Sequence, residues 1–211
     1  MKTIKFIVNA PVLGLLLGTF FITVLMWSLR FTSPRRVDRT FRVVQLGSAA
    51  LYSMGHGTND AQKTMGIIGA LLFTSVWSNQ QAAFAAGKAE IPFWIALACF
   101  LVIGFGTMAG GWRIVKTMGL KITKLKPHSG ACAETAAALT LFLSTKLGIP
   151  VSTTHTITGA IIGVGSIQRL SAVRWGVARN VVWAWILTIP ASALLGAAAV
   201  SALGLLRRFL S

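Results

Sequence analysis

Long apolar runs without a charged side chain are the feature that most constrains the fold of this chain. Residues 6–29, 91–112 and 180–206 contain no Asp, Glu, Lys or Arg. A helix needs roughly 20 apolar residues to cross the hydrocarbon core of a bilayer, and each of these runs is long enough. Charged residues make up only 11% of the chain, whereas a soluble domain carries about 25%. We therefore expect an integral membrane protein that is surrounded by lipid.

The apolar segments predict an all-α, polytopic membrane helix bundle. One membrane domain is expected to occupy residues 1–211. The polar, glycine-rich sequence of residues 55–60 favours a break between two helices, because Asn and Asp hydrogen-bond locally and cap the next helix. Discontinuous or re-entrant helices are therefore part of the expected fold. The expected segments are residues 6–29, 43–59, 64–87, 91–112, 127–145, 147–168 and 180–206.

The basic residues are confined to short stretches of the chain. The 20 Lys and Arg residues outnumber the 4 Asp and Glu residues, which gives a formal net charge of +16. Most of them lie in residues 30–42, 113–126 and 169–179, which long apolar runs separate. This is the positive-inside pattern of cytoplasmic loops, and it lacks the basic stripe with aromatic residues that binds nucleic acid. We expect a multi-pass protein of the cell (inner) membrane with no nucleic-acid partner.

Residues 57–64, GTNDAQKT, place ionisable and amide side chains between two apolar segments. An ionisable group at membrane depth is costly unless it is paired or hydrated, so Asp60 is a candidate binding residue for a cation, either Na⁺ or a proton. Glu134 interrupts a later apolar segment and is a second candidate of the same kind. The alternatives are that Asp60 and Lys63 neutralise each other at positions i and i+3 of one helix, and that Glu134 only pairs with a neighbouring helix.

Residues 150–156, PVSTTHT, concentrate hydroxyl groups directly after a proline. Proline followed by Ser and Thr is typical of a helix N-terminus. A helix that begins inside the membrane exposes free N–H groups and the positive end of its dipole, which together favour an anion. Secondary transporters use discontinuous helices in this way. The alternative is that the hydroxyls bond to their own backbone or to packed helices. Hydroxyls together with carboxylates indicate cation-coupled anion uptake.

The sequence lacks the motifs of most enzyme classes. The sequence has no nucleophile, base and acid in a known order and no GxxxxGK[ST] loop. His56, His128 and His155 lack the spacing of metal ligands, and Cys99 and Cys132 are expected to be small buried residues. We therefore expect no enzyme activity, no catalytic residue, no metal site and no cofactor other than the coupling ion.

The two polar motifs carry a resemblance to a known family. GHGTNDAQKTMGII followed by ETAAALTLFLSTKLGIPVSTTHTITGAIIGVG resembles the second half of inorganic phosphate transporters of the PiT family, and the likeness covers essentially the whole chain. The resemblance implies one half of an inverted-repeat transporter that carries inorganic phosphate. It implies substrate contacts at Asn59, Ser152, Thr153, Thr154 and Thr156, cation contacts at Asp60 and Glu134, and possible contributions from Gln62, Lys63 and His155.

The chain departs from that family in having one copy of the asparagine-aspartate signature. PiT transporters consist of two homologous halves with a signature in each. The chain is therefore expected to be a fragment, a half-protein that assembles with a first-half partner or with its own copies, or a degenerate remnant. Two functional alternatives stand beside phosphate transport: sulfate transport by the same fold, and a membrane interaction subunit that binds no substrate.

Overall fold

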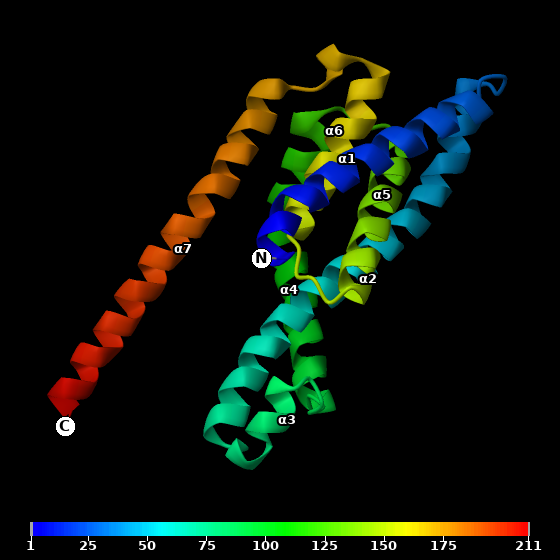
Figure 1. The fold of residues 1–211 in the computed structure, drawn as a ribbon. Helices are drawn as coiled ribbons and strands as arrows, with labels where there is room; N and C mark the ends of the chain where they lie inside the picture. The colour runs from blue at the N-terminus through cyan, green and yellow to red at the C-terminus, as the bar shows by residue number, and fades with distance from the viewer. Residues whose placement is uncertain (1, 211) are drawn as a thin grey trace. The chain divides into compact units, whose positions relative to one another are not determined.

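The computed structural model describes residues 2–210, and these residues form helices and short connections (Figure 1). No strand occurs between residues 2 and 210, so the all-α prediction is confirmed. Two compact units can be distinguished. The first extends to Val173, and the second, from Arg174 on, is essentially the single helix α7 (Trp175–Leu210). The single membrane domain therefore stays a prediction.

The first unit is built around five longer helices. They are α1 (Lys2–Ser28), α2 (Pro34–Ser75), α4 (Phe93–Lys116), α5 (Pro127–Lys146) and α6 (Thr153–Gln168). Shorter elements are η1 (Ser78–Gln80), α3 (Gln81–Ala85), the π-helical η2 (Thr117–Ile122) and η3 (Leu170–Ala172). Helix α1 packs against α5 and α6, whereas α2 packs against α5 and α4. In the contact between α2 and α4, Met65 packs with Ile95 and Cys99.

Helix α2 is continuous where we expected a break. It runs from Pro34 to Ser75 through the whole GHGTNDAQK sequence, so the prediction of separate segments at 43–59 and 64–87 is wrong. Gly55 does not end a helix but allows close packing, since a Cβ there would lie 3.3 Å from Cβ of Leu141 in α5. The remainder of the expected 64–87 segment contains η1 and α3.

The expected interruption between the segments 127–145 and 147–168 is present. Helix α5 ends at Lys146, and residues 147–152 are non-helical before α6 begins at Thr153 (Figure 1). Gly148, with a φ of +66°, adopts the left-handed conformation that closes a helix C-terminus. The main-chain N–H of Ile149 then bonds to the carbonyl of Ser144 at 2.9 Å. We refer to residues 147–152 as the α5–α6 connection.

Small residues bring α1 and α6 into direct backbone contact. A Cβ at Gly18 of α1 would lie 2.6 Å from the carbonyl oxygen of Ala160 in α6. A Cβ at Gly159 would collide with the carbonyl of Pro11, and one at Gly163 would collide with the carbonyl of Leu15. Small-residue interfaces of this kind let membrane helices approach closely. They fix the position of α6 and of its N-terminus.

Three helices are long and apolar enough to cross a membrane. In the described residues these spans are Lys5–Ser28, Phe93–Trp112 and Trp175–Gly204, with mean hydropathies of 2.0, 2.0 and 1.9. Large apolar side chains such as Phe105 and Met108 of α4 are exposed on the first unit. A water-soluble surface seldom presents so many apolar side chains together. The chain is a membrane protein.

Candidate functional site

The carboxylate of Asp60 lies where the middle of α2 meets the N-terminus of α6. Its Oδ1 accepts a hydrogen bond from Nζ of Lys63 at 2.9 Å. Its Oδ2 accepts one from the Thr153 hydroxyl of α6 at 3.2 Å. The side chains of Asp60 and Lys63 are 31% and 36% exposed, so the pair is open to an approaching ion. The alternative interpretation, an i,i+3 pair of Asp60 and Lys63, is thus present in the structure. Asp60 also contacts a second helix, α6.

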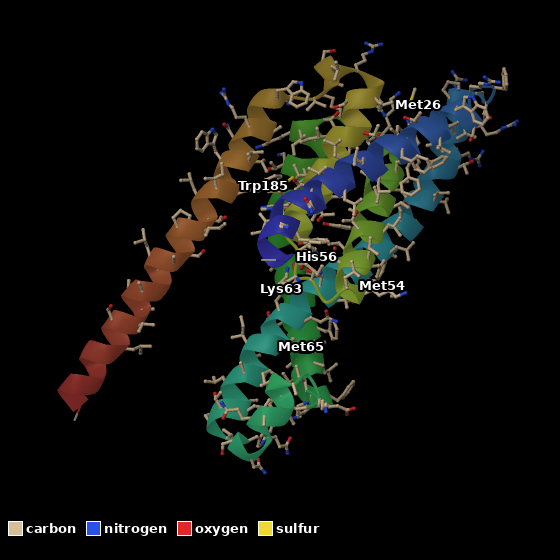
Figure 2. All side chains as sticks on the ribbon, viewed as in Figure 1. Met26, Met54, His56, Lys63, Met65 and Trp185 are labelled. Carbon is tan, nitrogen blue, oxygen red and sulfur yellow. The ribbon has the colours of Figure 1, made fainter. Side chains whose placement is uncertain are left out.

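Lys63 joins α2 to the α5–α6 connection. Besides its bond to Asp60, its ammonium donates to the main-chain carbonyl of Val151. Val151 is buried and immediately precedes Ser152, the N-cap residue of α6. Figure 2 shows Lys63 and His56 on the middle part of α2. One lysine therefore contacts both the carboxylate and the backbone that leads into α6.

The hydroxyl groups of residues 152–156 have separate partners. The Ser152 hydroxyl caps α6 by accepting a bond from the N–H of His155 at 3.4 Å. The Thr156 hydroxyl donates to the main-chain carbonyl of Ser152 at 2.9 Å, as the backbone-bonding alternative expects. Thr153 bonds to Asp60. Within the described part of the chain, the half-buried hydroxyl of Thr154 has no hydrogen-bond partner.

Helix α6 begins after the proline rather than with it. Pro150 lies in the α5–α6 connection, and the first helical residue is Thr153. The predicted helix N-terminus at this motif is correct, but Pro150 is not part of its first turn. The positive end of the α6 dipole lies close to the ammonium of Lys63, which bonds to Val151 two residues before the first residue of α6. The electrostatics of this end of α6 therefore favour an anion.

Asn59 is buried beside the charge pair and retains an unused acceptor. The residue is 4% exposed, and its amide nitrogen donates to the Thr145 hydroxyl of α5 at 3.4 Å. Its amide oxygen Oδ1 is buried and has no hydrogen-bond partner among the described residues. An unsatisfied buried acceptor is unusual in a folded protein. Asn59 can therefore accept a bond from a ligand donor or contribute an oxygen to a cation.

Glu134 lies apart from Asp60 and holds α5 against α2. Its Oε2 accepts a bond from the Ser48 hydroxyl at 2.5 Å, and its Oε1 accepts one from the Gln45 amide at 3.4 Å. Ser48 precedes Asp60 by about 18 Å along α2, at 1.5 Å per residue. Glu134 therefore contacts a neighbouring helix, as the alternative interpretation of this residue expects.

Two further predicted residues are less central. Gln62 is exposed on α2, and His155 is half-buried in the first turn of α6. No group of three or more His, Cys, Asp and Glu side chains in the described residues could hold a metal ion.

His56 was not predicted as part of the site. Its Nδ1 lies 3.7 Å from Oδ2 of Asp60, and it is buried without a hydrogen-bond partner in the part of the chain described. The signal was the i,i+4 spacing of His56 and Asp60, which a continuous helix places on one face. The partners Thr145 and Val151 come from other segments, and nothing in the sequence pattern identifies them.

A charge pair and a helix N-terminus that meet at a helix break in a membrane bundle are features of secondary transporters. A model of the Phosphate transporter family matches residues 13–196, and the chain belongs to this family. The predicted resemblance is thereby confirmed at the level of the family.

Curated relatives agree with this assignment. The chain is 54% identical over 197 residues to a probable low-affinity inorganic phosphate transporter of Rhizobium meliloti (strain 1021), covering 93% of this chain and 57% of the relative. It is 39% identical over 199 residues to a protein of the same name from Bacillus subtilis (strain 168), covering 94% and 58%. The chain thus spans somewhat more than half the length of these relatives. Both relatives are named as probable transporters, which agrees with the prediction of a transporter rather than an enzyme.

A solved structure has the same fold. It is named the sodium-dependent phosphate transporter, and it matches 90% of this chain and 62% of its own with a TM-score of 0.73 at 23% identity. At this identity the likeness concerns the arrangement of helices alone.

Proposed function

We propose that this chain is one half of a cation-coupled inorganic phosphate transporter of the cell membrane. The observation that carries the proposal is the meeting of the Asp60–Lys63 pair with the N-terminus of α6 at a helix break. Membership of the Phosphate transporter family supports phosphate as the substrate. The chain spans 57% and 58% of two relatives, so the complete transporter in this proposal also contains a first half.

Phosphate binds at the N-terminus of α6 in this proposal. The first-turn N–H groups and the Thr154 hydroxyl replace part of the water shell of the anion, and the helix dipole stabilises its charge. Ser152 and Thr156 shape this first turn through the bonds to His155 and to the Ser152 carbonyl. Asn59 adds the free acceptor Oδ1, which suits a protonated phosphate oxygen.

Asp60 couples the cation to the anion. Thr153 bonds to Asp60 and is also the first residue of α6, so the charge state of the carboxylate acts on the anion-binding turn through one hydrogen bond. A cation, Na⁺ or a proton, that neutralises Asp60 changes the electrostatic potential at this turn. Glu134 contributes by fixing α5 to α2, which positions the α5–α6 connection.

The experiment measures uptake of radiolabelled phosphate in cells that lack their own phosphate transporters. The chain is expressed alone and together with a first-half polypeptide of the same family, and its presence in the membrane is checked by immunoblot. Uptake that needs the chain and collapses with the cation gradient is expected. If the chain is in the membrane but no partner gives uptake, the proposal is wrong. The alternative of a membrane interaction subunit that binds no substrate would then remain. If sulfate inhibits phosphate uptake at concentrations comparable to those of phosphate, the site binds tetrahedral anions in general.

A further inference from the structure

We propose that an anionic phospholipid binds to this chain where α1 turns into α2. One acyl chain lies in an apolar groove between α1, α2 and α5, and the headgroup phosphate lies at the arginines of residues 30–42. The inference goes beyond phosphate transport and does not depend on it. Two separate observations carry it, namely the groove itself and a concentration of positive charge without acidic partners at the same end of these helices.

The groove lies near the turn that connects α1 to α2. The two helices meet at this turn, and α5 packs against both of them (Figure 1). The groove has a volume of about 220 Å³ and is lined by residues of α1, α2 and α5, among them Phe21, Val24, Phe41 and Val44. The α1 residues belong to the last turns of the apolar span Lys5–Ser28. Such a lining offers water few hydrogen bonds and suits an acyl chain.

Aromatic side chains place this end of the groove at the level of the lipid headgroups. Trp27 is 68% exposed, and tryptophan concentrates at the interface between membrane and water. The guanidinium of Arg30 lies 5.6 Å from the centre of the Trp27 ring and 4.6 Å from that of Phe31. Ser28 lines the groove and precedes Arg30 by two residues. The groove therefore extends from the hydrocarbon region to a positively charged interface.

The arginines at this interface have no acidic partner. Residues 30–42 contain five arginines and one acid, Asp38. The carboxylate of Asp38 lies 3.3 Å from Nδ1 of His128 in α5, and within residues 2–210 none of the five arginines forms an ion pair. Four of them lie in the first turns of α2, where the positive end of the helix dipole disfavours cations. A bound anion would relieve this accumulation of charge.

One molecule fits both the groove and the charge. A phospholipid joins acyl chains to a phosphate, so it can fill an apolar groove and reach cations at the groove's end. Arginine suits this phosphate because its planar guanidinium donates two parallel hydrogen bonds. Inorganic phosphate would use the arginines alone, whereas a phospholipid with a neutral headgroup would gain little from them. Clusters of basic residues directly after a membrane helix attract anionic lipids in the same way.

The first test compares two phospholipids that have the same acyl chains. The purified transporter that contains this chain is titrated in detergent with phosphatidylglycerol or phosphatidylcholine, and native mass spectrometry gives a Kd for each. We expect phosphatidylglycerol to bind at least about fivefold more tightly, the factor that one basic residue contributes to the affinity for anionic lipid. Equal Kd values would overturn the inference. A large excess of inorganic phosphate should not displace the lipid, and displacement would assign the arginines to the free anion instead.

The second test removes charge beside the groove. Arg30→Gln combined with Arg42→Gln is expected to raise the Kd of phosphatidylglycerol about tenfold or more and to leave that of phosphatidylcholine unchanged. Lys121→Gln combined with Arg169→Gln is the matched control, since it removes the same charge from exposed residues that do not line the groove. An unchanged Kd in the first variant, or an equal rise in the control, would contradict the inference.

The third test fills the groove without changing its charge. Val44→Trp is expected to raise the Kd of phosphatidylglycerol about tenfold, the effect of excluding about two methylene groups from apolar surroundings. Leu46→Trp is the control, because Leu46 is exposed on the same helix and does not line the groove. The unfolding temperature checks that each variant is folded, and Val24→Trp on the α1 side of the groove replaces Val44→Trp if that variant is not. Unchanged binding by a folded, filled variant would show that no acyl chain occupies the groove.

Discussion

Asp60 is held from three directions by groups that lie on two helices. Lys63 occupies one carboxylate oxygen, Thr153 occupies the other, and His56 approaches within 3.7 Å. The ion pair with Lys63 depends on the negative charge of the carboxylate. A residue with this set of contacts is suited to couple the charge of α2 to the first turn of α6.

Asp60→Asn keeps the size of the side chain and removes its charge. We expect coupled phosphate uptake to fall by about tenfold to a hundredfold, because a charged hydrogen bond is worth about 1.5 to 3 kcal/mol. The measurement is the initial rate of phosphate uptake under a cation gradient. Asp38→Asn is the matched control, since Asp38 lies in the same helix and pairs with His128 instead. A wild-type rate for Asp60→Asn, or an equal loss for Asp38→Asn, would refute the role of Asp60.

For single residues, the sequence predicts which side chains carry charge at the site better than it predicts the partners of those side chains. The cost of burying charge singles out Asp60, and the i,i+3 spacing predicts its bond to Lys63. The bond from Lys63 to the carbonyl of Val151 joins residues 88 positions apart, and no local pattern indicates it. The same holds for Glu134, whose partners lie in α2.

Helix α6 is positioned by its contact with α1, and this contact depends on glycine. Gly14 and Gly18 of α1 approach the backbone of Thr156 and Ala160 in α6, and Gly159 and Gly163 of α6 approach the backbone of Pro11 and Leu15 in α1. A Cβ at most of these positions meets the main chain of the other helix, which cannot move aside as a flexible side chain can. The first turn of α6 is therefore supported by the interface between α6 and α1.

Gly159→Ala is expected to destabilise the protein by about 1 to 3 kcal/mol, the usual cost of overpacking. The measurement is the thermal unfolding temperature of the purified protein in detergent. Gly104→Ala in α4 is the control, since a Cβ there meets nothing within 4 Å. It should leave the unfolding temperature unchanged or raise it slightly. Equal temperatures for Gly159→Ala and the unmodified protein would show that the α1–α6 interface is loose.

Sequence patterns mislead at α2 but not at the α5–α6 connection. Glycines and an Asn-Asp pair normally predict a helix break, yet α2 continues through them. The amide nitrogen of Asn59 and the charged groups of Asp60 and Lys63 find partners on other segments, namely Thr145, Thr153 and Val151, while the helix continues. Residues 147–152 do interrupt the helices, because Gly148 and Pro150 oppose helix continuation through their own backbone. The interruption at residues 147–152 has a local cause and was therefore predictable from the sequence. The continuity of α2 was not.

For the whole molecule, the basic residues set the expected orientation in the membrane. The structure places Arg35, Arg36, Arg39 and Arg42 in the first turns of α2, not in a loop. Helix α2 is about 60 Å long at 1.5 Å per residue, roughly twice the 30 Å of a bilayer core. Part of α2 therefore extends beyond the hydrocarbon region, and we expect its basic N-terminal turns to lie on the cytoplasmic side.

Cysteine labelling tests this orientation. Ser33→Cys, just before α2, is expected to resist a membrane-impermeant thiol reagent in intact cells and to react after permeabilisation. Lys88→Cys, between α3 and α4, is expected to react in intact cells. The native Cys99 and Cys132 are buried, so the background should be low. Ready labelling of Ser33→Cys from outside would invert the orientation.

The central claim is that phosphate binds at the N-terminus of α6, and the most direct measurement is equilibrium binding of radiolabelled phosphate to the purified, assembled transporter. Thr154→Val keeps the volume of the side chain and removes the hydroxyl that has no partner within the described residues. We expect its Kd to rise about tenfold to a hundredfold, the value of a hydrogen bond to a charged group. Thr135→Val is the control, since that hydroxyl only bonds to the carbonyl of Ala131 within α5. An unchanged Kd for Thr154→Val, or the same increase for Thr135→Val, would contradict the claim.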